Sequence, residues 1–369
     1  MGDAPVAVVA DQLRRRPTSG IATYTRGLLG GLRRLGGEVP RLVLVASKGP
    51  DRDPLETWGW PVWSSRLPGP LLTRVWDRGG GGGLVAGAGV VHATSLAAPV
   101  GAAAPLAVAV HDLAWRQFPE TFPRRGRRWH EAALARALRR ATVLVTPAEA
   151  TAELLREAGA GPDQVVVIPE GCDHLPVADA DGAAATLGAL GVSGPYLLSV
   201  ATLEPRKNLS RLVAAYTQAR DRLPEPWPLV VVGPRGWGAA MAPAAGVKLA
   251  GLVSDPVLAG LYAGARCLAY VPLGEGWGLP PVEAMSACVP VVASPVPSTG
   301  GAALEVDPTD VDAIADALVV ATGDDRRRSE LVTAGLLRAG ELTWAATAAA
   351  HARLWRSMAG TTRRTSGRP

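Results

Sequence analysis

The sequence predicts two α/β domains in tandem, each built on a doubly wound parallel sheet. The chain has 369 residues, which suits two domains of about 150–200 residues each. Short apolar runs alternate with helical segments through most of the chain, as they do where crossover helices join parallel strands. Hydrophobic residues make up 48% of the chain and aromatic residues only 5%, so the apolar content is mainly Ala, Val and Leu. This composition favours buried parallel strands covered by Ala-rich helices.

The first domain is predicted over residues 1–175. Its expected strands are, in order, PVAVVA, RLVLVAS, GVVHATS, PLAVAVHD, ATVLVTPA and QVVVIPEG. The segments WHEAALARALRRA and TAELLREAG, on either side of ATVLVTPA, are expected to be helices. This alternation predicts an open parallel sheet with right-handed crossovers. The glycine run at residues 79–83 is expected to be a flexible loop or a disordered insert.

A second series begins after a polar, Gly-containing stretch at residues 177–194, where we place the domain boundary. The second domain is predicted over residues 190–342. Its expected strands are PYLLSVATLE, PLVVVGPRG, VKLAGLV, CLAYVPL and PVVASP, and its expected helices are SRLVAAYTQARD, DPVLAGLYAGA and PPVEAMSAC. An amphipathic helix over residues 343–358 is expected to pack back toward the first domain, and residues 359–369 to be disordered.

Arginines occur in pairs and triplets in the first half of the chain, which has a net charge of +5 overall. One interpretation is a basic face that meets anionic lipid or a phosphorylated acceptor, and the other is a set of solvated helix faces. Nucleic acid binding is disfavoured, because no nucleic-acid-binding motif surrounds these arginines.

The three cysteines, Cys172, Cys267 and Cys288, lie far apart and have no paired spacing, so neither a disulfide framework nor a zinc site is indicated. The N-terminus lacks the pattern of a signal peptide, and the longest apolar run is interrupted by polar and helix-breaking residues. We therefore expect a cytoplasmic protein in which any membrane contact is peripheral, at the inner face of the membrane.

The segment VPLGEGWGLPPVEAMSACVPVVASP is the most informative one for chemistry. An expected strand runs into a Gly-rich loop, and a helix begins at Pro280-Pro281. Two carboxylates, Glu275 and Glu283, lie eight positions apart, one in the loop and one in the expected first helical turn. The glycines let a ligand approach the backbone, and free N–H groups at a helix start favour an anion. The pattern favours a polyhydroxylated diphosphate ligand, and the alternative is an acidic surface loop followed by an ordinary helix.

The Glu-x7-Glu pattern in GEGWGLPPVEAM, followed by PVVAS, resembles the signature of the retaining GT-B glycosyltransferases of family four (glycosyl transferases group 1). Further resemblances extend over nearly the whole chain and lie in TSGIATYTRGLL, VHDLAW, VVVIPEGCD, ATLEPRKNLSRLVAAY and AALEVDPTD. The overall pattern is most similar to bacterial mannosyltransferases of polysaccharide assembly. The resemblance implies a GT-B fold, in which two Rossmann-like domains face each other across a cleft. The first would bind the acceptor and the second the nucleotide sugar.

The resemblance also implies roles for individual residues of the second domain. Arg206 and Lys207 would neutralise the donor diphosphate, because the leaving nucleotide gains negative charge as the glycosidic bond breaks. The alternative for this pair is a surface ion pair with Glu204. Glu275 would bind donor-sugar hydroxyls next to the reacting carbon, and Glu283 would bind the ribose hydroxyls. The other implied donor-binding residues are Gly276, Trp277, Gly278, Leu279 and, beside the base, Val253.

In the first domain, His111 matches the active-site histidine that contacts the donor sugar in this family, and Asp112 would orient it. A histidine that ends a strand can also be purely structural. Ser19 and Gly20 match the loop that faces the donor phosphate and the acceptor, and Ser19 can equally be a helix N-cap.

The chain departs from the family pattern at three places. Val200-Ala201 stands where many members carry Gly-Arg, so the phosphate contact would depend more heavily on Arg206 and Lys207. Glu170 stands where the usual turn has Asn. The segment PVPSTGG lacks the usual Pro-Glu-Val, which predicts a shorter loop near the ribose.

These resemblances imply a retaining, metal-independent hexosyltransferase of polysaccharide biosynthesis. Its co-substrate would be a nucleotide-diphosphate sugar, GDP-mannose or another GDP- or dTDP-linked deoxyhexose, and it would need no cofactor. The acceptor would be a glycan, a lipid-linked glycan or a small molecule. The alternatives are a phosphorylase or sugar-nucleotide epimerase on the same fold, or a catalytically silent nucleotide-sugar-binding module. A nicotinamide oxidoreductase is disfavoured, because no G-x-G-x-x-G follows the first strand.

Overall fold

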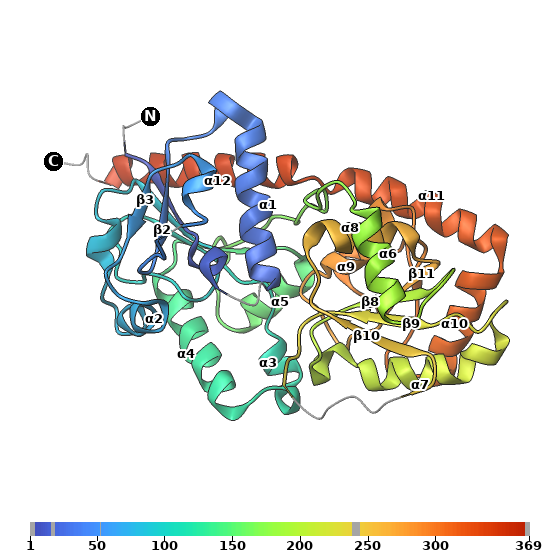
Figure 1. Ribbon diagram of the computed structural model, residues 1–369. Coiled ribbons are helices and arrows are strands. Elements are labelled where there is room, and N and C mark those ends of the chain that lie inside the picture. Colours follow the sequence, from blue (N-terminus) through green and yellow to red (C-terminus); the bar gives the residue numbers. More distant parts are fainter. Residues whose placement is uncertain (1–3, 16–18, 52, 238–243, 366–369) are drawn as a thin grey trace. The chain divides into compact units, whose positions relative to one another are not determined.

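The computed structural model describes residues 4–15, 19–51, 53–237 and 244–365. The chain divides into two compact units (Figure 1). Unit 1 consists of residues 1–116, 122–174 and 343–369, and unit 2 of residues 117–121 and 175–342. Each unit is built around one parallel sheet, which confirms the predicted α/β class with two Rossmann-like domains.

The sheet of unit 1 has the order β3-β2-β1-β4-β5-β6-β7, and all its strand pairs are parallel. Its strands are β1 (Val6–Val9), β2 (Leu42–Ala46), β3 (Val62–Ser64), β4 (Val90–Ala93), β5 (Leu106–Ala109), β6 (Val143–Thr146) and β7 (Val165–Val167). All six predicted strands are present, and β3 is an additional edge strand. In this order the topology switches direction between β1 and β4, the point where doubly wound sheets bind ligands.

Helices cover both faces of this sheet. A core of alternate strand residues packs with α2 (Gly69–Asp77), α4 (Arg124–Arg140) and α5 (Glu149–Glu157) on one face. The helices α1 (Gly20–Leu35) and α12 (Trp344–Thr365) pack against each other, and α12 also contacts β4. The short helix α3 (Ala114–Gln117) follows β5.

Two glycines allow α12 to lie close to α1. Gly27 and Gly31 are four residues apart and therefore share one face of α1. The fully buried Trp344 ring occupies the space where a side chain at position 27 would be, and the Trp344 carbonyl lies against Gly31. This close packing attaches the C-terminal helix to the first unit.

Two predictions for unit 1 are wrong. The glycine run at 79–83 is a tightly packed turn, because a Cβ at Gly101 would overlap the Gly79 carbonyl and one at Gly82 would overlap the Gly101 carbonyl. Helix α12 continues to Thr365, so residues 359–365 are helical and not disordered. The rest of the predicted tail lies outside the described residues.

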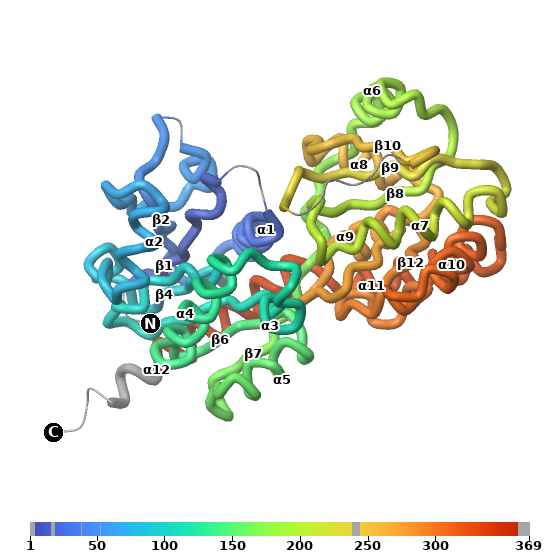
Figure 2. Tube along the Cα trace, turned by 90° about the horizontal axis from the view of Figure 1, so that it is seen from below, coloured from blue at the N-terminus to red at the C-terminus, as the bar shows by residue number. Residues whose placement is uncertain are grey.

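The sheet of unit 2 has the order β10-β9-β8-β11-β12-β13, again with parallel pairs only. Its strands are β8 (Leu197–Val200), β9 (Leu229–Val232), β10 (Val247–Gly251), β11 (Cys267–Tyr270), β12 (Val291–Ala293) and β13 (Leu304–Glu305). Figure 2 shows β10, β9 and β8 side by side. The five predicted strands are present, and the switch point lies between β8 and β11.

The helices of unit 2 also lie on both faces of its sheet. The helices α7 (Leu209–Ala219) and α10 (Val311–Gly323) pack together over one core cluster. The helix α9 (Leu279–Ser286) contacts β11 and β12 and packs against α8 (Asp255–Gly264) and α11 (Asp325–Glu341).

Residues 175–189 belong to unit 2, although we predicted that the second domain begins at residue 190. They include a helix, α6 (Ala180–Ala189), that packs on α8. Gly260 of α8 permits this contact, because a Cβ there would lie 2.7 Å from the Asp179 carbonyl and 2.8 Å from the Ala183 side chain. The sequence of α6, which is rich in Ala and Gly, did not indicate a helix, because this helix depends on its packing against α8.

The packing of α12 on α1 can be tested with two neighbouring glycines. A Cβ at Gly31 would overlap the Trp344 main chain, whereas a Cβ at Gly30 meets nothing within 4 Å. We expect Gly31→Ala to destabilise the protein by about 1–3 kcal/mol through overpacking. Gly30→Ala should be neutral or stabilise it by about 0.5–1 kcal/mol, because Ala is the better helix former. Thermal unfolding of the two variants checks this, and equal melting temperatures would contradict the described packing.

Candidate functional site

The predicted donor-binding residues of unit 2 lie at the carboxyl ends of two neighbouring strands. Strand β8 leads through residues 201–204 into the short helix η6 (Pro205–Lys207), which carries Arg206 and Lys207. Strand β11 leads into the loop 271–278, which carries Glu275. Because β8 and β11 pair at the switch point of the sheet, both segments emerge at the same edge.

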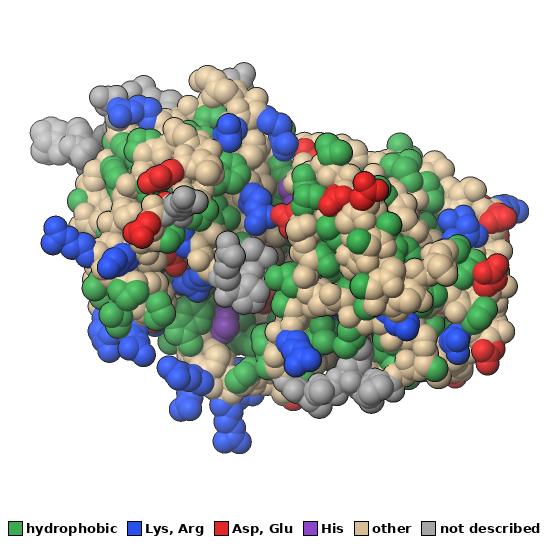
Figure 3. All heavy atoms as spheres, viewed as in Figure 1, with side chains coloured by type: hydrophobic (Ala, Val, Ile, Leu, Met, Phe, Trp, Pro, Cys, Tyr) green, Lys and Arg blue, Asp and Glu red, His purple; other side chains and the backbone are tan. Residues whose placement is uncertain are grey.

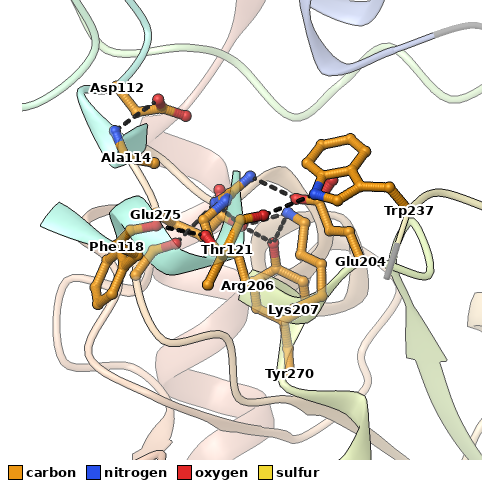
Figure 4. A network of polar contacts seen from close by, with 11 residues as sticks. Asp112, Ala114, Phe118, Thr121, Glu204, Arg206, Lys207, Trp237, Tyr270 and Glu275 are labelled. Carbon is orange, nitrogen blue, oxygen red and sulfur yellow. Dashed lines mark hydrogen bonds and ion pairs between the residues drawn. The ribbon is translucent and has the colours of Figure 1, made fainter. Parts of the chain in front are cut away.

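Two cations and two carboxylates form one buried cluster at this edge (Figure 4). The Arg206 guanidinium lies 2.9 Å from Glu275 Oε1 and 3.1 Å from Glu204 Oε1. The Lys207 ammonium donates to the same Glu275 oxygen and, over 3.2 Å, to the Tyr270 hydroxyl. The Tyr270 hydroxyl in turn donates to Glu275 Oε1 over 3.0 Å. Arg206 does pair with Glu204, as the alternative reading expects. The pair is buried, however, and Arg206 also pairs with Glu275, so it is more than a surface ion pair.

Charge interactions in the cluster affect its two carboxylates in opposite directions. Burial by itself would raise the pKa of Glu275, but the neighbouring Lys207 and Arg206 outweigh it and lower that pKa to about 2. For Glu204, burial dominates over the same two cations, and the nearby Glu275 charge adds to it, so its pKa is raised. Glu275 is therefore the firmly ionised partner of the two cations.

The two loops are fixed to each other by main-chain contacts. Arg206 donates to the Gly274 carbonyl over 2.8 Å, and the Leu273 N–H donates to the Arg206 carbonyl over 2.9 Å. Asn208 has a left-handed backbone with φ of 57°, and its side-chain amide donates to the Val271 and Pro308 carbonyls over 3.0 and 2.7 Å. The position of the charges is thus built into the backbone at this edge.

The start of α9 differs from the expectation in one respect. Gly278 precedes the helix with φ of 95°, and its carbonyl accepts a hydrogen bond from Ser298 Oγ over 2.6 Å. Pro280 and Pro281 occupy the second and third helical positions and have no N–H. The expected set of free N–H groups at this helix start is therefore reduced, which leaves more of any anion binding to Arg206 and Lys207.

Glu283 lies one turn further along α9 and is 5% exposed. Its carboxylate accepts a hydrogen bond from the Tyr262 hydroxyl of α8 over 2.7 Å. Burial, followed by the Glu283 charge, raises the pKa of Tyr262 well above its usual value, so this hydroxyl remains a donor. Val253 is half-buried in the otherwise exposed loop between β10 and α8. Of the residues between Glu275 and α9, Gly276, Trp277 and Gly278 are buried and Leu279 is half-buried.

The segment 117–121 was not recognised from the sequence, although it contacts the Glu275 loop. The Phe118 ring lies where a side chain at Gly274 would be, so only glycine fits there. The Thr121 carbonyl accepts a hydrogen bond from Trp237 Nε1 over 2.7 Å. This segment thus supports the loop from a distant part of the sequence, and no local motif indicates it.

In unit 1, His111 lies just beyond β5 with both ring nitrogens in hydrogen-bond contact. Its Nδ1 lies 3.0 Å from Glu170 Oε1, and its Nε2 lies 3.0 Å from the Thr94 carbonyl. Asp112 accepts a hydrogen bond from the Ala114 N–H at α3 and acts on His111 through its charge, so its orienting role stays a prediction. Glu170, noted in the sequence only as a departure from the family turn, is the partner of His111.

Ser19 and Gly20 are exposed at the start of α1. Ser19 is the N-cap residue by position, but its side chain makes no capping hydrogen bond. Their expected role beside the donor phosphate remains a prediction.

Two further observations on the described residues concern metal-binding groups and membrane-spanning helices. In residues 4–15, 19–51, 53–237 and 244–365, His, Cys, Asp and Glu side chains form no group of three or more that could hold a metal ion. Among the helices of the same ranges, none is both long enough and apolar enough to span a bilayer.

Two sequence models of glycosyltransferase families match the chain. The model of the glycosyl transferases group 1 matches residues 194–324, and that of the glycosyl transferase 4-like domain matches residues 19–171. Together the two matches account for most of the chain. Residues 19–171 thus match the glycosyl transferase 4-like family, and residues 194–324 match the glycosyl transferases group 1.

The similar curated proteins include two mannosyltransferases of Escherichia coli. The chain is 32% identical over 249 residues to the O-antigen chain mannosyltransferase B, a match that covers 63% of this chain and 65% of that protein. It is 35% identical over 126 residues to the serotype-specific mannosyltransferase WbdA, a match that covers 32% of this chain and 15% of that protein. The chain thus spans less than two thirds of each of these relatives.

A solved structure with a similar fold is that of Anabaena Alr3699/HepE in complex with UDP and glucose. The TM-score is 0.74, the sequence identity is 18%, and the match covers 96% of this chain and all of that chain. At this level of identity the likeness bears on the fold. It agrees with a two-domain GT-B architecture for this glycosyltransferase.

The charge cluster predicts a particular dependence of stability on pH. A carboxylate whose pKa is lowered from 4.5 to about 2 stabilises the fold above about pH 4.5, and this contribution is lost as the pH falls through about 2. Glu275→Gln removes this titration but also removes the carboxylate that Arg206 and Lys207 share. We expect the variant to be less stable at neutral pH, and its free energy of unfolding to fall less steeply between pH 4.5 and 2, by up to about 1.4 kcal/mol per pH unit.

Urea unfolding at a series of pH values measures this slope. The exposed Glu225 of the same unit provides a matched control, Glu225→Gln, which should keep the wild-type slope. A Glu275→Gln slope equal to that of the wild type would show that Glu275 is not the ionised partner in the cluster.

Proposed function

We propose that this glycosyltransferase transfers a hexose from a nucleotide-diphosphate sugar to a glycan, glycolipid or small-molecule acceptor, with retention of the anomeric configuration. The observation that carries the proposal is the buried contact of Arg206 and Lys207 with Glu275 at the β8–β11 switch point. The proposed donors are GDP-mannose and GDP- or dTDP-linked deoxyhexoses. The similarity to mannosyltransferases supports mannose first.

Each residue has a proposed role that follows from its chemistry. Arg206 and Lys207 bind the diphosphate and stabilise the charge that grows on it as the bond to the sugar breaks. Glu275, ionised and already a hydrogen-bond acceptor, binds donor-sugar hydroxyls. Glu283, held by Tyr262, binds the ribose hydroxyls, and Val253 contributes backbone contacts to the base. In unit 1, His111 contacts the donor sugar, and Ser19 and Gly20 face the donor phosphate and the acceptor.

In the proposed reaction the bond between the anomeric carbon and the phosphate oxygen breaks. The acceptor hydroxyl attacks the same face that the nucleotide leaves, and the new glycosidic bond forms there. The leaving phosphate oxygen takes the proton of that hydroxyl, so the products are the glycoside and the protonated nucleotide diphosphate. This route needs no protein nucleophile.

Binding of the donor can be tested by thermal unfolding with a panel of nucleotide diphosphates and their sugars. A ligand at about a hundred times its dissociation constant should stabilise the wild type by roughly 2.7 kcal/mol. Lys207→Ala and Glu283→Ala should lose this stabilisation, whereas Lys248→Ala, on strand β10, should keep it. A folded wild type that responds to no nucleotide sugar would overturn the donor site.

The products then test the reaction class. Release of nucleotide diphosphate should require an acceptor, and proton NMR of the product should show the anomeric configuration of the donor. An inverted product would overturn retention, and sugar release that requires phosphate alone would favour a phosphorylase.

We also propose that α4 makes peripheral contact with an anionic membrane. Figure 3 shows Lys and Arg side chains over the part of the surface where α4 lies. The exposed arginines of this helix are Arg124, Arg125, Arg128, Arg139 and Arg140. Such residues contribute about 1 kcal/mol each near an anionic bilayer.

Cosedimentation with phosphatidylglycerol vesicles tests this contact. Replacing Arg124 and Arg125 together with Ala should weaken binding about 30-fold, since two such residues contribute about 2 kcal/mol. The matched double variant at Arg326 and Arg327, on α11 of the other unit, should bind as the wild type does. Binding that is equal in both variants, or equal on neutral vesicles, would contradict the contact.

A further inference from the structure

The ring of His111 is held between two oxygen atoms that accept hydrogen bonds. Glu170 Oε1 lies 3.0 Å from Nδ1, and the Thr94 carbonyl lies 3.0 Å from Nε2. The Tyr24 ring packs edge-on against the imidazole, with 4.7 Å between ring centroids. The imidazole is therefore fixed in orientation as well as in its hydrogen bonds.

This geometry determines the protonation state of His111. A main-chain carbonyl and a carboxylate have no proton to give, so each ring nitrogen must carry one to form both bonds. Burial alone would lower the pKa of His111, but the hydrogen bond and the charge of Glu170 outweigh it, with smaller contributions from Thr94 and Asp112, and the pKa is raised.

Helix α12 fixes the position of Glu170, which is 4% exposed. On one side of it, the Pro169 carbonyl accepts a hydrogen bond from Thr347 Oγ1 over 2.8 Å. On the other side, Gly171 lies so close to the start of α12 that a Cβ would overlap the Trp344 main chain. Asp173 accepts a hydrogen bond from the Trp344 N–H over 2.6 Å. The residues on both sides of Glu170 are thus fixed against α12, and they position its carboxylate.

The other titratable groups around the imidazole are of two kinds. Tyr24, His92 and His351 stay neutral, and Asp112 and Glu170 are carboxyl groups whose charge favours a protonated imidazole. His351 donates from Nδ1 to the Thr347 carbonyl over 2.8 Å, so its Nε2 accepts from the Tyr24 hydroxyl over 2.9 Å. Burial and the His111 charge lower the pKa of His351 to about 4, and burial lowers the pKa of His92 well below its usual value. One positive charge is therefore concentrated on His111.

We propose that Glu170 is a positioning residue that holds His111 as a doubly protonated imidazolium, able to donate hydrogen bonds but not to accept a proton. This proposal rests on the proposed transferase function, because it assigns His111 a role in that reaction. His111 supplies a fixed positive charge at the carboxyl end of β5 and is not the general base. The proton of the acceptor hydroxyl then goes to the leaving phosphate oxygen.

The protonation state can be measured without any activity. The five histidines of the full-length protein are labelled with 13C at Cε1, the His111 signal is assigned with His111→Gln, and its titration is followed by NMR. Glu170→Gln keeps the hydrogen-bond acceptor and removes the charge. We expect its His111 signal to titrate at distinctly lower pH than in the wild type. Glu170→Asp, which keeps the charge, should restore part of the difference.

Glu149→Gln, an exposed carboxylate of α5 in the same unit, is the matched control and should leave the titration unchanged. Thermal unfolding shows that each variant is folded. An identical His111 titration in folded wild type and folded Glu170→Gln would overturn the proposal.

The second measurement is the pH profile of sugar transfer. In Glu170→Gln the alkaline limb of kcat should move to lower pH by the same amount as the NMR titration. The imidazolium fraction at high pH, and kcat with it, should fall about tenfold for each pH unit by which the limb moves. A displaced titration with an unmoved pH profile would overturn the role of the imidazolium in transfer. A displaced titration in a protein that transfers no sugar would contradict the proposed function and leave the positioning by Glu170 intact.

Discussion

The charged edge of unit 2 depends on Glu275, the carboxylate that contacts both buried cations. Arg206 and Lys207 are adjacent in the chain, and the Arg206 and Lys207 side chains are only 10% and 14% exposed. Two like charges in such surroundings would be costly without a counterion. Glu275 supplies it, and the main-chain bonds between η6 and the loop 271–278 keep the three groups in contact. The sheet order places both segments at one edge. The fold thus brings Glu275 to the two cations, and the ion pairs in turn stabilise the packing of the two segments.

This arrangement also explains how the cations stay ready for an anion. Lys207 and Arg206 are held by Glu275 in fixed positions, so a diphosphate would meet donors that are already oriented. Burial raises the pKa of Glu204, so of the two carboxylates Glu275, whose pKa is lowered, is the one that stays ionised most firmly. Pro280 and Pro281 deprive the start of α9 of two N–H groups. The side-chain cations are consequently the main source of positive charge that this edge offers.

The strands could be predicted because a buried parallel strand is a continuous apolar run, and each predicted run formed one. The short edge strands β3 and β13 have mixed sequences and gave no such pattern. Helix α6 was missed because its Ala-rich sequence shows no amphipathic face, and its packing on α8 decides its structure. The glycine run at 79–83 was misjudged because close packing between glycines leaves the same composition as a flexible loop.

The same contrast holds for the functional residues. Arg206, Lys207, Glu275 and Glu283 lie in segments with a recognisable local pattern, and the structure brings the first three into contact. The partner of His111 could not be found in that way, since Glu170 lies 59 residues further along the chain. Its position depends on α12, nearly 180 residues beyond it, through Thr347. Pairings of this kind depend on tertiary structure, and no pattern of neighbouring residues encodes them.

Each sheet thus places a cation against a carboxylate at its carboxyl edge, but the two pairs differ in how they respond to pH. Lysine and arginine keep their charge well above neutral pH, whereas a histidine loses its charge within the range where enzymes work. Because the pKa of His111 is raised, the stability that its pair with Glu170 contributes is fully present below the ordinary histidine pKa of 6.5 and is lost as the pH rises through the raised value. As the pH rises through that raised value, weakening of the protein should therefore begin in unit 1, while the charge cluster of unit 2 is still intact.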